Sequence, residues 1–107
     1  MIPATEALAR LREGNRRFVE RVASPAEGPS AGQEPFAIIL GCSDSRVPAE
    51  LVFGQGFGDL FVIRVAGNIV APSQVGSIEF AAERFGTRLV VVLGHSRCGA
   101  VQAQIPK

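Results

Sequence analysis

The chain has 107 residues, of which 47% are hydrophobic and 20% charged, a composition typical of one small globular domain rather than of a disordered segment. Its net charge of +1 gives no reason to expect nucleic acid as a partner, and no apolar run approaches the ~20 residues of a membrane span. The N-terminus has no hydrophobic signal segment, so we expect a cytoplasmic protein that binds no membrane.

The first predicted element is an amphipathic helix over residues 5–22, with Thr5 as its N-cap. Its apolar residues recur at helical spacing: Leu8, Leu11, Phe18 and Val22. The five arginines of this segment are interleaved with glutamates, which is typical of a solvated helix face rather than of a polyanion site. Residues 23–32 are rich in breakers of regular structure, and we expect a loop that lets the helix pack away from the rest.

Apolar runs of strand length follow, separated by helical segments. These predicted strands cover residues 36–40, 60–65 and 88–93. Between the first two strands, a short helix is expected to begin near Pro48. Between the last two, the spacing of apolar residues predicts a helix that Ser73 caps and Gly86 ends.

Strands that alternate with helices predict an α/β fold with a mainly parallel β-sheet flanked by helices. We expect a single domain over residues 1–107, divided into a helical arm at 1–22 and an α/β core at 33–107. Residues 99–104 enter another helix, and three strands make a small sheet for this topology. We therefore expect that the domain is truncated at its C-terminus or that a partner chain completes the sheet.

Both cysteines and the single histidine follow two of the predicted strands. Cys42 comes directly after the first strand and Gly41, while His95 and Cys98 follow the third. Because parallel strands place their carboxyl ends at one edge of a sheet, we expect these side chains to meet. Two thiolates and an imidazole suit a tetrahedral Zn²⁺ whose fourth position stays open to water. Inert core thiols and a disulfide are the alternatives, and the His-x-x-Cys spacing favours the metal.

An acidic residue and an arginine stand beside the first cysteine. Asp44 and Arg46 both lie within four residues of Cys42. The planar guanidinium of an arginine can hold a carboxylate in one orientation. A carboxylate held in this way can accept a hydrogen bond from water or hydroxide on a neighbouring zinc ion. The alternative is an ordinary surface ion pair.

Two short segments carry the most specific pattern in the chain, CSDSRVP at residues 42–48 and GHSRCGA at residues 94–100. Both closely resemble the signatures of the β-class carbonic anhydrases, in the same order and at a matching separation. Further similarity covers essentially the whole chain, at residues 11–18, 58–64, 66–68 and 76–81. The resemblance implies the fold of that family and one Zn²⁺ per chain.

The resemblance also implies roles for individual residues. The implied zinc ligands are Cys42, His95 and Cys98, and the implied catalytic pair is Asp44 and Arg46. Gln33 matches a glutamine that reaches the substrate from the partner subunit, and an apolar pocket for carbon dioxide at the dimer interface is implied for Phe61, Ala66 and Phe80. For these three pocket residues, core packing is an equally good interpretation. We therefore expect a homodimer or a higher homo-oligomer.

The reaction implied by the resemblance is the reversible hydration of carbon dioxide to bicarbonate and a proton by zinc-bound hydroxide, the activity of a carbonate dehydratase, which is a zinc lyase. Two alternatives stay open. The same site could hydrolyse carbonyl sulfide or carbon disulfide, or the chain could be a non-catalytic fragment that binds zinc.

Overall fold

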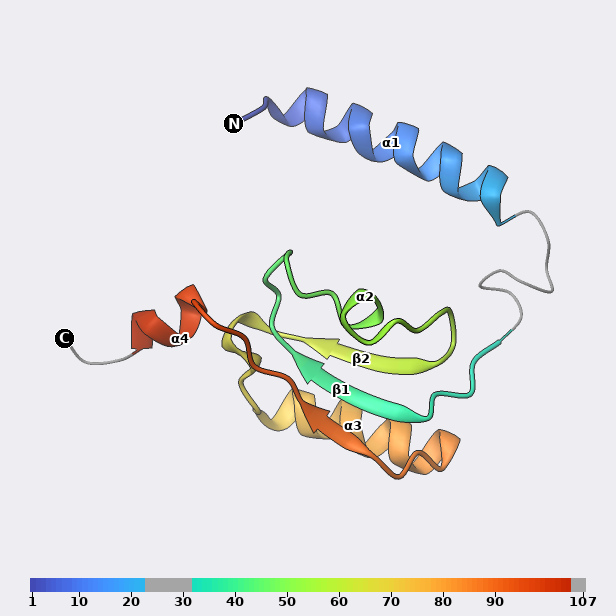
Figure 1. Ribbon diagram of the computed structural model, residues 1–107, viewed down its shortest axis with the longest axis vertical. Coiled ribbons are helices and arrows are strands. Elements are labelled where there is room, and N and C mark those ends of the chain that lie inside the picture. Colours follow the sequence, from blue (N-terminus) through green and yellow to red (C-terminus); the bar gives the residue numbers. More distant parts are fainter. Residues whose placement is uncertain (23–31, 105–107) are drawn as a thin grey trace. The chain divides into compact units, whose positions relative to one another are not determined.

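The computed structural model describes residues 1–22 and 32–104 and consists of two units, Met1–Gly32 and Gln33–Lys107. In the first unit, helix α1 spans Ala4–Arg21 (Figure 1). The N-cap is Pro3 rather than the predicted Thr5, because the Pro3 carbonyl already accepts the N–H of Ala7 and Thr5 lies in the first turn. The loop predicted for residues 23–32 lies outside the described residues, apart from Gly32.

The interleaved charges of α1 pair with one another along the helix. Arg16 is 2.7 Å from Glu13 and 2.6 Å from Glu20, at the i,i+3 and i,i+4 positions that face each other on a helix. All three side chains are at least half exposed. Their charges are therefore paired on the helix surface, as the sequence pattern indicated.

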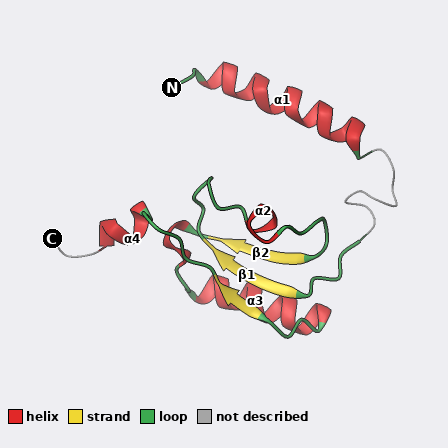
Figure 2. Cartoon of the chain, in the orientation of Figure 1, coloured by secondary structure: helices red, strands yellow, loops and turns green. Residues whose placement is uncertain are grey.

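The second unit is built on three parallel strands, as predicted. They are β1 (Ala37–Gly41), β2 (Leu60–Arg64) and β3 (Val90–Val92), in the order β2-β1-β3 (Figure 2). Gly41 pairs with Arg64 on one side of β1, and Leu40 pairs with Val92 on the other. The carboxyl ends of all three strands therefore align at one edge of the sheet.

The central strand forms the core of this unit. All five residues of β1 are buried, and Ile38, Ile39 and Leu40 are at most 2% exposed, as expected for a strand covered on both faces. By contrast, Val90 and Val92 of β3 are 44% and 55% exposed. Burial in the sheet therefore falls away from β1 towards β3.

Helices cover both faces of the sheet (Figure 1). On one face, Ala49 of α2 (Ala49–Phe53) packs with Ala37 and Ile39 in the hydrophobic core. On the other face, the ring of Phe61 lies 6.0 Å from the rings of Phe80 and Phe85, which belong to α3 (Pro72–Phe85). The structure is thus the predicted parallel sheet flanked by helices.

Helix α2 begins directly after Pro48, as predicted, whereas the predicted start of α3 is corrected. The N-cap of α3 is Ala71 and not Ser73, because the Gln74 side chain already accepts the Ala71 N–H at 3.2 Å. Gly86 ends the helix in a left-handed conformation, as predicted. The 3-10 turn η2 (Ala66–Asn68) follows β2, and α4 (Gly99–Gln104) follows β3. Among residues 1–22 and 32–104, no helix has the length and hydropathy that crossing a membrane requires.

Candidate metal centre

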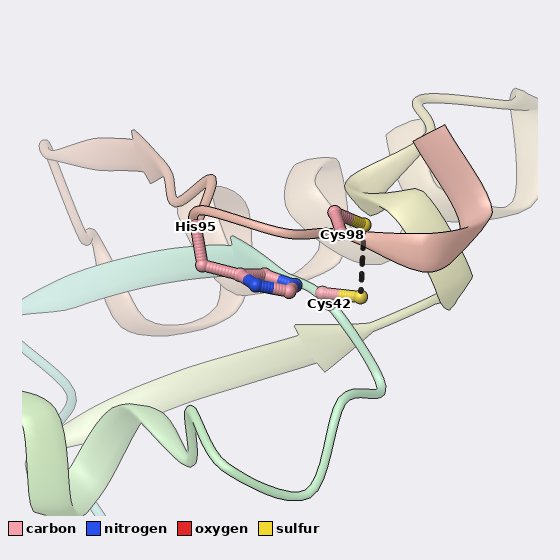
Figure 3. Close-up of side chains that lie close together, drawn as sticks. All are labelled: Cys42, His95 and Cys98. Atoms are coloured by element: carbon pink, nitrogen blue, oxygen red, sulfur yellow. Dashed lines mark hydrogen bonds between the residues drawn. The ribbon is translucent and has the colours of Figure 1, made fainter. Parts of the chain in front are cut away.

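The three predicted metal ligands meet at the carboxyl edge of the sheet. Cys42 lies in the loop after β1, which we call the first ligand loop (residues 42–46), and His95 and Cys98 lie in the second ligand loop (residues 95–98) after β3. The ligand atoms of the three residues lie within 4.8 Å of one another. Figure 3 shows the three side chains close together, with the imidazole of His95 extending towards Cys42 and the two sulfur atoms facing each other. Strand order and register therefore unite residues far apart in sequence.

The two sulfur atoms have the separation of zinc ligands. Both cysteines are free and buried, and their Sγ atoms lie 3.8 Å apart (dashed line in Figure 3). Two thiolates at the corners of a zinc tetrahedron are also about 3.8 Å apart, because each Zn–S bond is about 2.3 Å long. The sulfur atoms are too distant for a disulfide, whose S–S bond is about 2.05 Å. Their spacing thus fits the metal and not the disulfide.

His95 presents an unpaired nitrogen to the two sulfur atoms. Its Nδ1 lies 2.9 Å from the carbonyl oxygen of Ser96, and because a carbonyl only accepts, Nδ1 carries the proton. Its Nε2 is buried and has no hydrogen-bond partner among the described residues. A buried nitrogen without a partner is costly unless it binds something else. With the proton of the neutral imidazole on Nδ1, Nε2 is the nitrogen that would bind a zinc ion held by the cysteines.

Backbone groups prepare Cys42 as a thiolate. The N–H of Gly67 in η2 points at its sulfur from 3.3 Å. This contact, together with His95, lowers the pKa of the Cys42 thiol to about 6. The same interaction with Cys42, aided by the Ser96 carbonyl, raises the pKa of His95. A thiolate is the form that binds zinc, so the lowered pKa of Cys42 favours metal binding at neutral pH.

Asp44 and Arg46 form the planar pair that the sequence predicted. Arg46 donates from Nε to Oδ1 at 2.9 Å and from Nη2 to Oδ2 at 2.6 Å, and its backbone N–H reaches the same Oδ1. These bonds hold the pKa of the Asp44 carboxyl well below its usual range. Oδ2 also lies 3.9 Å from Nε2 of His95. An ionised carboxylate of fixed orientation therefore stands directly beside the ligand cluster.

Arg64 joins the first ligand loop to the sheet. It is the last residue of β2, and it donates from Nε to the Cys42 carbonyl at 2.8 Å and from Nη2 to the Asp44 carbonyl at 2.6 Å. Neither this role nor that of the Gly67 N–H was anticipated from sequence. The available signals were an arginine at the carboxyl end of a strand and a glycine in the segment that follows it.

Left-handed backbone conformations shape both sides of the centre. Gly67 has a φ of 78°, and a Cβ there would lie 3.4 Å from the Cβ of Ala100 in α4. In the second ligand loop, Arg97 has a φ of 56°, which is unusual for a residue with a side chain. The chain thus adopts a left-handed conformation directly beside two of the predicted metal ligands, Cys42 and Cys98.

The predicted substrate residues occupy three different places. Phe61 and Phe80 are packed together between β2 and α3, with Phe80 still 54% exposed. Ala66 is exposed in η2, immediately before Gly67 and thus near Cys42. Gln33 is exposed and precedes β1, so it lies at the opposite end of that strand from Cys42. Within one chain, Gln33 is therefore separated from the ligands by the length of the sheet.

Comparison with known proteins identifies carbonic anhydrases among the curated relatives of this chain. The family model described as carbonic anhydrase matches residues 37–107. The chain is 49% identical over 102 residues to carbonic anhydrase 2 of Mycobacterium tuberculosis, an alignment that covers 89% of this chain and 49% of that protein. The chain spans about half the length of the curated relatives it matches.

Solved structures show the same architecture. The β-carbonic anhydrase CcaA superimposes with a TM-score of 0.79 at 34% identity, over 91% of this chain and 52% of that one. A β-carbonic anhydrase of Sordaria macrospora, described as tetrameric, superimposes with a TM-score of 0.71 at 30% identity, over 96% and 55% of the two chains. Fold and sequence therefore point to the same family.

Proposed function

The chain belongs to the β-carbonic anhydrase family, and we propose that it carries the zinc centre of an enzyme that reversibly hydrates carbon dioxide to bicarbonate and a proton. One observation carries the proposal. Two thiol sulfurs 3.8 Å apart and an unpaired imidazole nitrogen converge beside a carboxylate that Arg46 holds in place. This combination supplies both a metal site and a group to orient a reactant there.

Cys42, His95 and Cys98 would hold one Zn²⁺ per chain. When bound, zinc lowers the pKa of a coordinated water towards ~7 and so supplies a nucleophile at neutral pH. Two thiolates also cancel the formal charge of the ion, which makes it a weaker Lewis acid than one held by three imidazoles. The residues around the ligands would then contribute more to orienting the reacting oxygen.

Asp44 is the residue we assign to that orientation. Its carboxylate is only 17% exposed and is held by two side-chain bonds from Arg46. Because its pKa is held low, it remains an acceptor at neutral pH. It can therefore accept a hydrogen bond from the attacking oxygen and leave a lone pair directed at carbon dioxide.

The substrate residues lead us to propose a homodimer or a higher homo-oligomer. Gln33 lies at the far end of β1 from its own Cys42, so it could assist only the site of a second copy. Phe61 and Phe80, which pack together, and Ala66, which lies nearer Cys42, would contribute apolar surface for uncharged carbon dioxide from the two subunits that meet at that interface. Size-exclusion chromatography with light scattering tests the assembly, and a strictly monomeric active chain would exclude this role for Gln33.

Stopped-flow hydration of carbon dioxide by the zinc-loaded chain tests the activity. We expect wild type to accelerate proton release, and Cys42→Ser and Asp44→Ala to lose most of that acceleration. Equal rates for the three proteins would overturn the proposal. The same preparations, supplied with carbonyl sulfide or carbon disulfide, distinguish the alternative substrates by release of sulfide.

Two further points of the proposal have their own tests. Stoichiometric zinc without hydration would support the alternative of a non-catalytic zinc-binding fragment. A cytoplasmic location, which the sequence led us to expect, is tested by cell fractionation with an antibody to the chain.

A further inference from the structure

The Arg64 side chain contacts the backbone of the first ligand loop and not its side chains, in the hydrogen bonds recorded among the described residues. Its guanidinium spans the carbonyl oxygens of Cys42 and Asp44, at 2.8 Å and 2.6 Å, and so brackets Ser43. Arg46, in contrast, binds the carboxylate of Asp44 directly. The two arginines thus fix different parts of the same loop, one its backbone and the other its side chain.

The first ligand loop leaves the sheet, so its carbonyls are no longer paired by a neighbouring strand. The N–H of Val65 bonds the carbonyl of Gly41 at 3.0 Å, and the β1–β2 pairing ends there. Beyond that point the Asp44 carbonyl accepts the N–H of Val47 at 3.2 Å within the turn, whereas Arg64 is the donor recorded for the Cys42 carbonyl among the described residues. Register places Arg64 directly opposite Gly41, so its side chain extends the pairing by two further bonds.

We infer that Arg64 is a positioning residue for the metal centre, an inference that rests on the zinc site proposed above. By fixing the carbonyls of Cys42 and Asp44, it sets the place of both side chains relative to the second ligand loop. The distances at stake are 3.8 Å between the two sulfur atoms and 3.9 Å between Asp44 Oδ2 and His95 Nε2. Arg64 therefore acts on both the ligand and the carboxylate.

The shape of the side chain matters as much as its charge. A guanidinium offers donors in a rigid fork, whereas the ammonium of lysine is a compact point charge on a flexible stem. One ammonium is poorly suited to hold two carbonyls separated by an intervening residue. Arg64→Lys thus keeps the charge and the strand position but cannot bond both carbonyls at once. It is therefore the more informative variant.

The test uses the whole chain and Zn²⁺, with affinity measured by competition against a chromophoric chelator. Outer residues that orient metal ligands typically change affinity by about 10–100-fold when removed, and we expect a loss of that size for Arg64→Ala and a smaller one for Arg64→Lys. Visible absorption of the Co²⁺-loaded proteins should shift in both variants, because these bands report the arrangement of ligands. Circular dichroism establishes whether each variant is folded. If Arg64→Ala is unfolded, the zinc affinity and the Co²⁺ spectrum of Arg64→Lys alone test the inference.

The matched control is Arg88→Ala, which removes an exposed arginine that precedes β3 at the opposite edge of the sheet. We expect it to leave zinc affinity and the Co²⁺ spectrum unchanged. Arg64 variants with wild-type affinity and spectrum would overturn the inference, as would full rescue by lysine. Because neither readout requires turnover, a wild-type chain that binds zinc without hydrating carbon dioxide would overturn the proposed function alone. A wild-type chain that binds no zinc would overturn both.

Discussion

The two ligand loops reach the same centre but are held in different ways. The first ligand loop receives bonds from β2, from η2 and from within itself, through Arg64, Gly67 and Arg46. For the second, apart from the contact between the Cys98 and Cys42 sulfur atoms, the hydrogen bonds recorded among the described residues are local, from His95 to the Ser96 carbonyl and from the N–H of Gln102 to the Cys98 carbonyl. The first half of the centre is therefore held by hydrogen bonds from neighbouring elements, whereas the second depends on its own backbone, on β3 and on the packing of α4 against η2.

The two strands that lead into these loops also differ, in how deeply they are buried. The first ligand loop follows β1, which is buried on both faces, whereas the second follows β3, whose Val92 is 55% exposed. A catalytic centre needs both halves within a few tenths of an ångström of their working positions. We conclude that the placement of β3 limits the precision of this centre, and the variants below test that asymmetry.

The largest effect is expected from removing a ligand on either side. If the roughly 10–16 kcal/mol of zinc binding in structural sites is shared among four ligands, each accounts for about 2.5–4 kcal/mol, or roughly 60- to 700-fold in affinity. Cys42→Ser and Cys98→Ser should each lose about this much in chelator competition. Ser43→Ala, at an exposed neighbouring position, serves as the control. Wild-type affinity in either cysteine variant would exclude that residue as a ligand.

A smaller effect is expected when the carboxylate of the first loop is neutralised. Asp44→Asn removes the charge that Arg46 holds and should slow hydration by about 10–100-fold, with zinc affinity nearly retained. Stopped-flow hydration and metal analysis measure the two quantities separately. The matched control is Asp59→Asn, whose carboxylate accepts the N–H of Gly56 in the turn before β2, remote from the ligands. If both variants slow the reaction equally, Asp44 has no special role.

Gly67→Ala should weaken the contact between the backbone N–H of residue 67 and the Cys42 sulfur in the first ligand loop. A side chain at a φ of 78° costs about 1–2 kcal/mol of stability, and its Cβ would be in van der Waals contact with Ala100. Displacing the Gly67 N–H from the sulfur should also raise the pKa of the Cys42 thiol above about 6 in the metal-free chain. Urea unfolding and thiolate absorbance at increasing pH measure these changes.

Gly76→Ala is the control for that substitution. Gly76 lies inside α3 with open space where a Cβ would be built, so alanine there should stabilise the helix by about 0.5–1 kcal/mol. The two glycine variants are therefore expected to change stability in opposite directions. A stabilised Gly67→Ala protein would show that the turn at η2 does not require glycine.

The smallest effect is expected from Arg97→Gly in the second loop. Glycine relieves about 1–2 kcal/mol of backbone strain at a φ of 56° in the folded chain. It also gives the unfolded chain more conformational freedom, which costs about 0.5–1 kcal/mol of stability. We therefore expect the folded state to be stabilised by about 0.5 kcal/mol. Thermal unfolding of the metal-free protein measures it. A clear loss of stability would mean that the Arg97 side chain braces the second loop, and the contrast between the loops would then be weaker.

The sequence was sufficient to predict the sheet and the ligand cluster. Apolar runs identified all three strands, and strand ends brought Cys42 towards His95 and Cys98 because parallel strands share an edge. The predicted strand over residues 88–93 is shorter in the structure. Its hydrogen bonds to β1 end at the Leu89 carbonyl and the Leu93 N–H.

Contacts made by backbone groups could not be predicted in the same way. Arg64 meets Cys42 and Asp44 only because Gly41 and Arg64 are in register, and a single sequence does not fix register. The N–H of Gly67 depends in turn on a left-handed turn that several glycines in the chain could equally adopt. Side-chain chemistry is visible in the sequence, whereas these supporting contacts appear only with the pairing of the strands.

The wide separation of the ligands in sequence has a consequence for folding. Joining Cys42 to Cys98 closes a loop of 56 residues, whose ends meet only after β1 and β3 have paired. The entropy of closing such a loop is lost in forming the sheet, before any ion binds to all three residues. An ion that needs the complete set therefore selects molecules with paired strands and draws the population towards them by mass action. The rate at which the chain acquires metal would then report how often its slowest, most distant strand pairing is formed.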